Sequence, residues 1–127
     1  MPGLQVSAYV SVGFPLGMLS RLFLGSHSSW QALSDANIGS NQRPSVPCLL
    51  LMGTRDQFTS LSTVEQLVQQ QWDLHDRLKD AAKTAGKTVA HTLCKAFQLQ
   101  VLKGCDHFFF DQWERVASVA VSWAANL

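Results

Sequence analysis

The chain has 127 residues, of which 46% are hydrophobic and 15% charged, and its formal net charge is +1. This composition excludes an intrinsically disordered chain, and so small a charge argues against nucleic acid or an anionic membrane as a partner. No run reaches the roughly 18 apolar residues that a membrane span needs. The length suits a single compact unit over residues 1–127.

The three cysteines, Cys48, Cys94 and Cys105, are odd in number and show no C-x-x-C spacing. Neither a disulfide framework nor a zinc ribbon is expected from this pattern, and reduced thiols indicate an intracellular, cytoplasmic location. Cys48 lies in an apolar run, where it is expected to pack as a small hydrophobic side chain.

The first third of the chain predicts a strand and then a short helix. Val6–Val12 alternates small polar residues with β-branched and aromatic ones, which is typical of a strand. Glycine and proline in Gly13–Gly17 end it. Ser28–Leu33 predicts a short helix with a serine near its N-cap.

The middle of the chain predicts a buried strand followed by a long helix. Ile38–Pro47 is polar and rich in turn residues, so a loop is expected there. Cys48–Met52 is a continuous apolar run, as in a parallel strand buried on both faces. Ser62–Glu65 has the capping-box pattern that opens a helix, and Gly86 is a natural stop for it.

The last third predicts a strand and a final helix. Thr88–Ala96 is ambiguous, whereas Phe97–Leu102 alternates and indicates a strand. Apolar residues from Phe109 to Leu127 recur at helical spacing and mark an amphipathic helix. Strands that alternate with helices imply an α/β class with three mainly parallel strands and flanking helices.

Two loops stand out because each directly follows a strand: Gly53–Phe58, which contains Asp56, and Gly104–Phe108, which contains His107. Ligands of open parallel sheets bind beyond the carboxyl ends of the strands. We therefore expect Asp56 and His107 to lie at one sheet edge, within or near hydrogen-bond reach. A carboxylate there fixes the tautomer of the histidine, whose other nitrogen acts as a base.

Three segments resemble the α/β-hydrolases of the dienelactone-hydrolase and serine-aminopeptidase-like type. LLLMGTRDQFT (49–59) is similar to the strand and acid loop, GCDHFF (104–109) to the histidine loop, and VSVGFPLG (10–17) to the strand before them. The resemblance implies the C-terminal part of an α/β-hydrolase domain, with Asp56 as triad acid and His107 as triad base. It also implies hydrolysis of a small-molecule ester, thioester or amide, without a cofactor or a metal.

The chain departs from this family at the nucleophile. A G-x-S-x-G elbow should precede the first strand, but no such motif occurs, and the oxyanion-hole loop is also absent. The acid-to-histidine connection is expanded over Gln69–Ala96. Ser20, Ser26, Ser28 and Ser60 do not lie on a strand-to-helix elbow. The chain alone is therefore expected to be inactive, as a truncated gene model, a splice or gene fragment, or a degenerate family member.

Two other functional classes stay open. A non-catalytic interaction module of hydrolase ancestry would keep the triad positions as vestiges. A nucleotide-binding domain is disfavoured because neither G-x-G-x-x-G nor G-x-x-x-x-G-K-[ST] occurs. We also expect self-association through the Val6–Val12 edge, which carries no charge, lysine or proline to block pairing.

Single residues also have structural alternatives. On position alone, Asp56 also fits a turn aspartate, and His107 a loop histidine packed among Phe108, Phe109 and Phe110, whereas the resemblance favours the triad positions for both. Core packing is favoured over a pocket lining for the three phenylalanines, and Asp106 is expected to bond to backbone. Gly13–Gly17 either shapes a pocket or turns the chain. No site is assigned to the remaining histidines, His27, His75 and His91.

Overall fold

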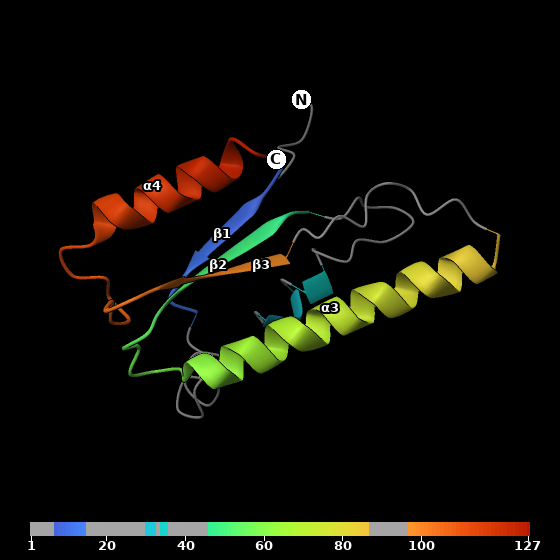
Figure 1. The fold of residues 1–127 in the computed structure, drawn as a ribbon, viewed down its shortest axis with the longest axis horizontal. Helices are drawn as coiled ribbons and strands as arrows, with labels where there is room; N and C mark the ends of the chain where they lie inside the picture. The colour runs from blue at the N-terminus through green and yellow to red at the C-terminus, as the bar shows by residue number, and fades with distance from the viewer. Residues whose placement is uncertain (1–6, 15–29, 33, 36–45, 87–96) are drawn as a thin grey trace.

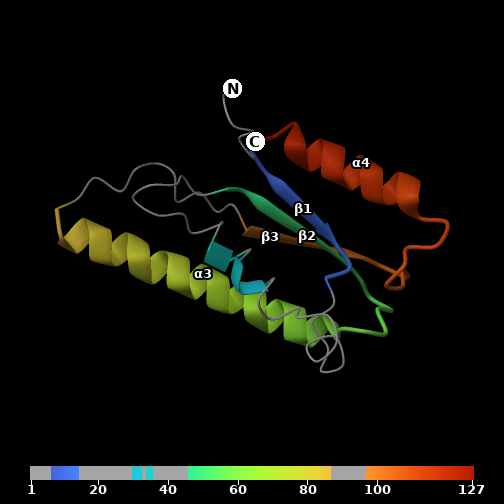
Figure 2. The same cartoon turned by 180° about the vertical axis from the view of Figure 1, so that it is seen from behind.

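The computed structural model describes residues 7–14, 30–32, 34–35, 46–86 and 97–127, which form a small α/β fold. Its elements are β1 (Tyr9–Val12), β2 (Cys48–Gly53), α3 (Leu61–Thr84), β3 (Phe97–Leu102) and α4 (Trp113–Ala124). The three strands form one parallel sheet in the order β1-β2-β3. Helix α3 covers one face of the sheet and α4 the other (Figures 1 and 2).

Strand β2 is the centre of the sheet, and all six of its residues are buried. Cys48 is in register with Tyr9 of β1 and with Phe97 of β3. A continuous apolar run is stable here because β2 has a strand on each side and a helix over each face. The predicted buried strand and the predicted strand Phe97–Leu102 are both confirmed.

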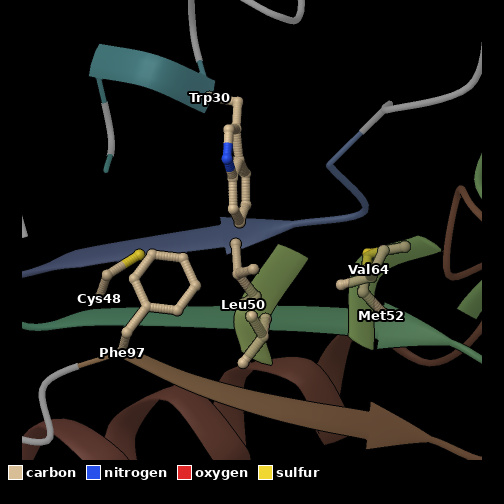
Figure 3. Packing of buried hydrophobic residues seen from close by; sticks show 7 residues of the cluster. Trp30, Cys48, Leu50, Met52, Val64 and Phe97 are labelled. Carbon is tan, nitrogen blue, oxygen red and sulfur yellow. The ribbon is translucent and has the colours of Figure 1, made fainter. Parts of the chain in front are cut away.

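The side chains of β2 alternate between two cores. Cys48, Leu50 and Met52 face α3 and pack with the residues shown in Figure 3, which include Val64 of α3 and Phe97 of β3. Leu49 and Leu51 face α4 and pack with the second core: Leu102, Cys105, Phe109 and Val116. Because the strand has a period of two residues, one apolar run supplies both layers.

Helix α3 begins two residues earlier than the sequence pattern indicates. Ser60, not Ser62, is the N-cap, and its Oγ accepts a hydrogen bond from the backbone N–H of Thr63. The expected capping box is therefore wrong in register, since several neighbouring hydroxyls can each cap a helix. The predicted end is close: α3 stops at Thr84, and Gly86 adopts φ +65° just beyond it.

Polar contacts anchor α3 to the rest of the fold. The indole N–H of Trp72 donates to the carbonyl of Phe97 at 2.8 Å. The hydroxyl of Ser34, in a short helical piece at residues 30–32 and 34–35, donates to the buried Gln71 side chain at 2.6 Å. The predicted short helix is thus seen at its described residues, and Trp30 from it packs over the sheet (Figure 3).

The remaining sequence predictions are met in part. The first strand starts at Tyr9, later than expected, and Val6 lies outside the described residues, as do 15–29, 38–45 and 87–96. The final helix starts at Trp113, so Phe109 belongs to the loop before it, where its positive φ of 52° prevents helical continuation. No described helix is long and apolar enough to span a membrane.

Candidate active site

Asp56 is held by its own loop. Its Oδ1 accepts hydrogen bonds from the backbone N–H groups of Phe58 at 2.8 Å and Thr59 at 3.0 Å. The Thr59 hydroxyl in turn donates to the carbonyl of Phe14, just after β1. The carboxylate is 1% exposed, so this pair of backbone donors both solvates it and fixes its rotation.

The second oxygen of Asp56 meets His107. The distance from Oδ2 to Nδ1 of His107 is 2.8 Å, and the histidine side chain is 17% exposed. The expected proximity of the two side chains is confirmed, at the carboxyl ends of the adjacent parallel strands β2 and β3. A carboxylate has no proton to give, so Nδ1 is the donor, and in neutral imidazole Nε2 is left as the proton acceptor.

Hydrogen bonds join the two loops on both sides of this pair. The N–H of Arg55 donates to the carbonyl of Cys105 at 2.9 Å, and the N–H of Gly104 donates to the Thr54 hydroxyl at 2.9 Å. The N–H of His107 donates to the side-chain oxygen of Gln57 at 3.2 Å. These bonds fix the relative position of the acid and the histidine independently of their own contact.

Two glycines permit the close approach of the histidine loop to the ends of β1 and β2. A Cβ on Gly53 would lie 2.2 Å from the carbonyl oxygen of Cys105, which no side chain could tolerate. A Cβ on Gly13, at φ +63°, would lie 2.9 Å from the carbonyl oxygen of His107 and 3.4 Å from its ring. The glycine directly after β1 thus makes room for the histidine loop, as well as turning the chain.

Aromatic rings surround the imidazole. The ring centroid of Phe58 lies 4.6 Å from that of His107, and the centroid of Phe108 lies 5.3 Å away with its plane nearly perpendicular. Within the described part of the chain, Nε2 of His107 has no hydrogen-bond partner. A base with one nitrogen fixed and the other unoccupied is equipped to take a proton from a hydroxyl or a water.

Other candidate residues have structural roles. Asp106 accepts a bond from the backbone N–H of Phe108 at 3.0 Å, as expected. Ser60 caps α3, and the other candidate serines lie outside the described residues, as do His27 and His91. His75 lies on α3 with its side chain 12% exposed, 3.8 Å from Asp76. Among residues 7–14, 30–32, 34–35, 46–86 and 97–127, no three His, Cys, Asp or Glu side chains could hold a metal.

A polar hollow of about 420 Å³ lies beside the histidine loop. His107 is not among the residues that line it. Its lining consists of Arg55, Gln57, Gly104, Cys105, Asp106, Phe110 and Gln112.

The cysteines that are described, Cys48 and Cys105, are free and buried. Burial raises the pKa of the Cys48 thiol to about 12, because the thiolate would lose its hydration. Cys48 is therefore a packing residue of the core, as the sequence indicates, and an unreactive one.

The expected core packing of the phenylalanine run is confirmed for Phe109 and wrong for Phe108 and Phe110. Phe109 is fully buried in the core under α4, whereas Phe108 and Phe110 are 45% and 69% exposed. Sequence reasoning missed Gln57 and Thr54, because a contact across some fifty positions leaves no local signal. Gly13 had a signal, since a glycine directly after a strand often marks a close backbone approach.

No protein-family model, curated protein or solved structure matches this chain.

Proposed function

We propose that the chain carries the acid and the base of a serine-hydrolase catalytic triad, as the C-terminal part of an α/β-hydrolase domain. The observation that carries the proposal is the 2.8 Å contact between Asp56 Oδ2 and His107 Nδ1. Its setting supports the same conclusion: the pair lies at the carboxyl edge of a parallel sheet, in the order acid and then histidine along the chain. The reaction class is hydrolysis of an ester, thioester or amide.

In this proposal His107 acts first as a general base and then as a general acid. Its Nε2 takes the proton from a serine hydroxyl as that oxygen attacks the carbonyl carbon, and then gives the proton to the leaving group. Asp56 stabilises the imidazolium that forms between these steps, and because its Oδ1 is held by two backbone N–H groups, it does so without rotating. In this proposal the serine is supplied by residues other than these 127, because the sequence contains no G-x-S-x-G elbow.

A fluorophosphonate probe tests the proposal, because it reacts with serines that a neighbouring base activates. The 127-residue chain and the same chain extended by the in-frame coding sequence upstream of Met1 are labelled side by side. We expect no labelling of the short chain and labelling of a single serine, in a G-x-S-x-G elbow, in the extended chain. His107→Ala or Asp56→Asn should each slow labelling by roughly 10³-fold or more.

His75→Gln is the matched control, since this histidine lies on α3 away from the pair, and labelling should persist in it. Labelling of the extended chain that survives His107→Ala would overturn the assignment of the base. An upstream frame that is closed, or that encodes no elbow serine, would favour the non-catalytic interaction module instead.

A further inference from the structure

Three exposed phenylalanines form a continuous surface, here called the aromatic strip: Phe58, Phe108 and Phe110. They are 44%, 45% and 69% exposed. The centroids of Phe58 and Phe108 are 5.8 Å apart with an edge-to-face geometry, and those of Phe108 and Phe110 are 5.6 Å apart. Rings in mutual contact that remain open to water form an apolar patch, in contrast to scattered exposed side chains.

The strip is continuous with the candidate active site. Phe58 and Phe108 both contact the imidazole of His107, at centroid distances of 4.6 and 5.3 Å. Phe110 contacts Phe108 and extends the strip away from His107. A ligand whose reacting bond is at His107 therefore has an apolar surface extending away from that bond, and this surface is built from both loops that carry the catalytic pair.

The backbone of the histidine loop enforces this exposure. Phe109 and Asp111 both have positive φ, at 52° and 56°, which is unfavourable for residues with a side chain. The left-handed turn at Phe109 sends its ring into the core, whereas the rings on either side of it stay outside. Two unfavourable conformations are thus retained in a segment that presents Phe108 and Phe110 to the solvent.

We propose that the aromatic strip binds the apolar acyl chain of the substrate, so that the site takes esters or thioesters of hydrophobic acids in preference to those of small or charged acids. This inference rests on the proposed function, whose substrate class it names. Two carboxylates near these rings are already engaged: Asp56 is 1% exposed and paired with His107, and Asp106 accepts a hydrogen bond from the backbone N–H of Phe108. Phe110 also lines the neighbouring hollow, where Arg55 and Asp106 offer polar contacts.

Binding of uncleavable amides to the 127-residue chain tests this without catalysis. N-methyloctanamide and N-methylacetamide are titrated separately, and the backbone amide resonances are followed by NMR. We expect N-methyloctanamide (hereafter octanamide) to shift the resonances of Phe58, Phe108 and Phe110. It should bind at least roughly tenfold more tightly than N-methylacetamide (hereafter acetamide), because its additional methylene groups are removed from water on binding. Phe108→Ser and Phe110→Ser should each weaken octanamide binding by roughly fivefold.

Val121→Ser is the matched control: this residue is also largely exposed, on α4, and its loss should leave octanamide binding unchanged. Octanamide should also bind His107→Gln, so that failure of the labelling experiment and failure of this one are distinguishable. Equal affinity for the two amides, or shifts confined to other residues, would overturn the proposal. So would a Phe110→Ser chain with altered sedimentation but unaltered octanamide affinity, because the strip would then be a contact between copies of the chain.

Discussion

Replacing Gly53 by alanine should separate Asp56 from His107 without changing either residue. The new Cβ would lie 2.2 Å from the carbonyl oxygen of Cys105 and 2.6 Å from its carbonyl carbon, whereas ordinary contact begins near 3.4 Å. These are backbone atoms, which cannot rotate away, so the histidine loop must move by about 1 Å. A shift of that size takes the 2.8 Å Asp56–His107 contact out of hydrogen-bond range.

The loss of unfolding free energy expected for Gly53→Ala has two contributions. Forcing a methyl group into packed backbone costs about 1–3 kcal/mol. Losing a buried hydrogen bond to a charged group costs about 1.5–3 kcal/mol. We therefore expect Gly53→Ala to lower the free energy of unfolding by about 2.5–6 kcal/mol, a large share of the total for a domain of this size.

Urea unfolding measures the stability, and the downfield proton of the His107 Nδ1–H in the NMR spectrum reports the pair. Gly104→Ala is the matched control, because Gly104 lies in the same loop but its Cβ would meet nothing within 4 Å. At φ +83° that control should cost only the backbone strain, about 1–2 kcal/mol, and keep the imidazole proton.

A double-mutant cycle separates the two contributions. In an Asp56→Ala background the contact with His107 is already absent, so Gly53→Ala should cost about 1.5–3 kcal/mol less than in the parent chain. A Gly53→Ala chain that matches Gly104→Ala in stability and keeps the Nδ1–H signal would refute the close approach of the two loops, and with it the geometry from which the proposed function is argued.

Three further predictions follow from single residues. Asp56→Asn leaves one side-chain oxygen to serve both the loop amides and His107, so it should destabilise the fold by about 2–3 kcal/mol in urea unfolding; an unchanged midpoint would show that the carboxylate is not held as described. The Cys48 pKa is raised from 9.0 to about 12, so between these values the unfolded state loses a proton that the folded state keeps. Stability that this thiol contributes should thus be complete below pH 9 and be lost as pH rises towards 12, and a Cys48→Ala chain should show a weaker loss over this range. Strand β1 pairs only with β2 among the described residues and exposes Val10, so Val10→Lys should weaken self-association by roughly tenfold in sedimentation equilibrium, whereas Val121→Lys should not.

Strand β2 could be predicted from the sequence because burial on both faces leaves a local signature. Cys48–Met52 is apolar without interruption, and no amphipathic helix has that pattern, so its assignment depended on no distant residue. The start of α3 was less predictable, since Ser60 and Ser62 both offer a hydroxyl, and only the path of the preceding loop decides between them. The choice of N-cap residue is therefore determined by tertiary structure and not by the local sequence.

The sequence predicted the two reactive side chains of the candidate site, but not the hydrogen bonds that hold their loops together. Asp56 and His107 each follow a predicted strand, and parallel strands bring their carboxyl ends to one edge, which was enough to place the two side chains together. The contacts of Gln57 with His107 and of Thr54 with Gly104 join residues fifty positions apart, and they depend on the register of β2 against β3. A single sequence carries no record of that register.

Asp56 also shows that its two interpretations are compatible. As a turn aspartate it would cap its own loop, and Oδ1 does this with the N–H groups of Phe58 and Thr59. As a triad acid it would orient a histidine, and Oδ2 is 2.8 Å from Nδ1 of His107. Because both oxygens belong to one planar group, fixing the first in the loop determines where the second lies. The turn is therefore what aims the acid, and a residue that performed only one of the two tasks could not hold the imidazole in this position.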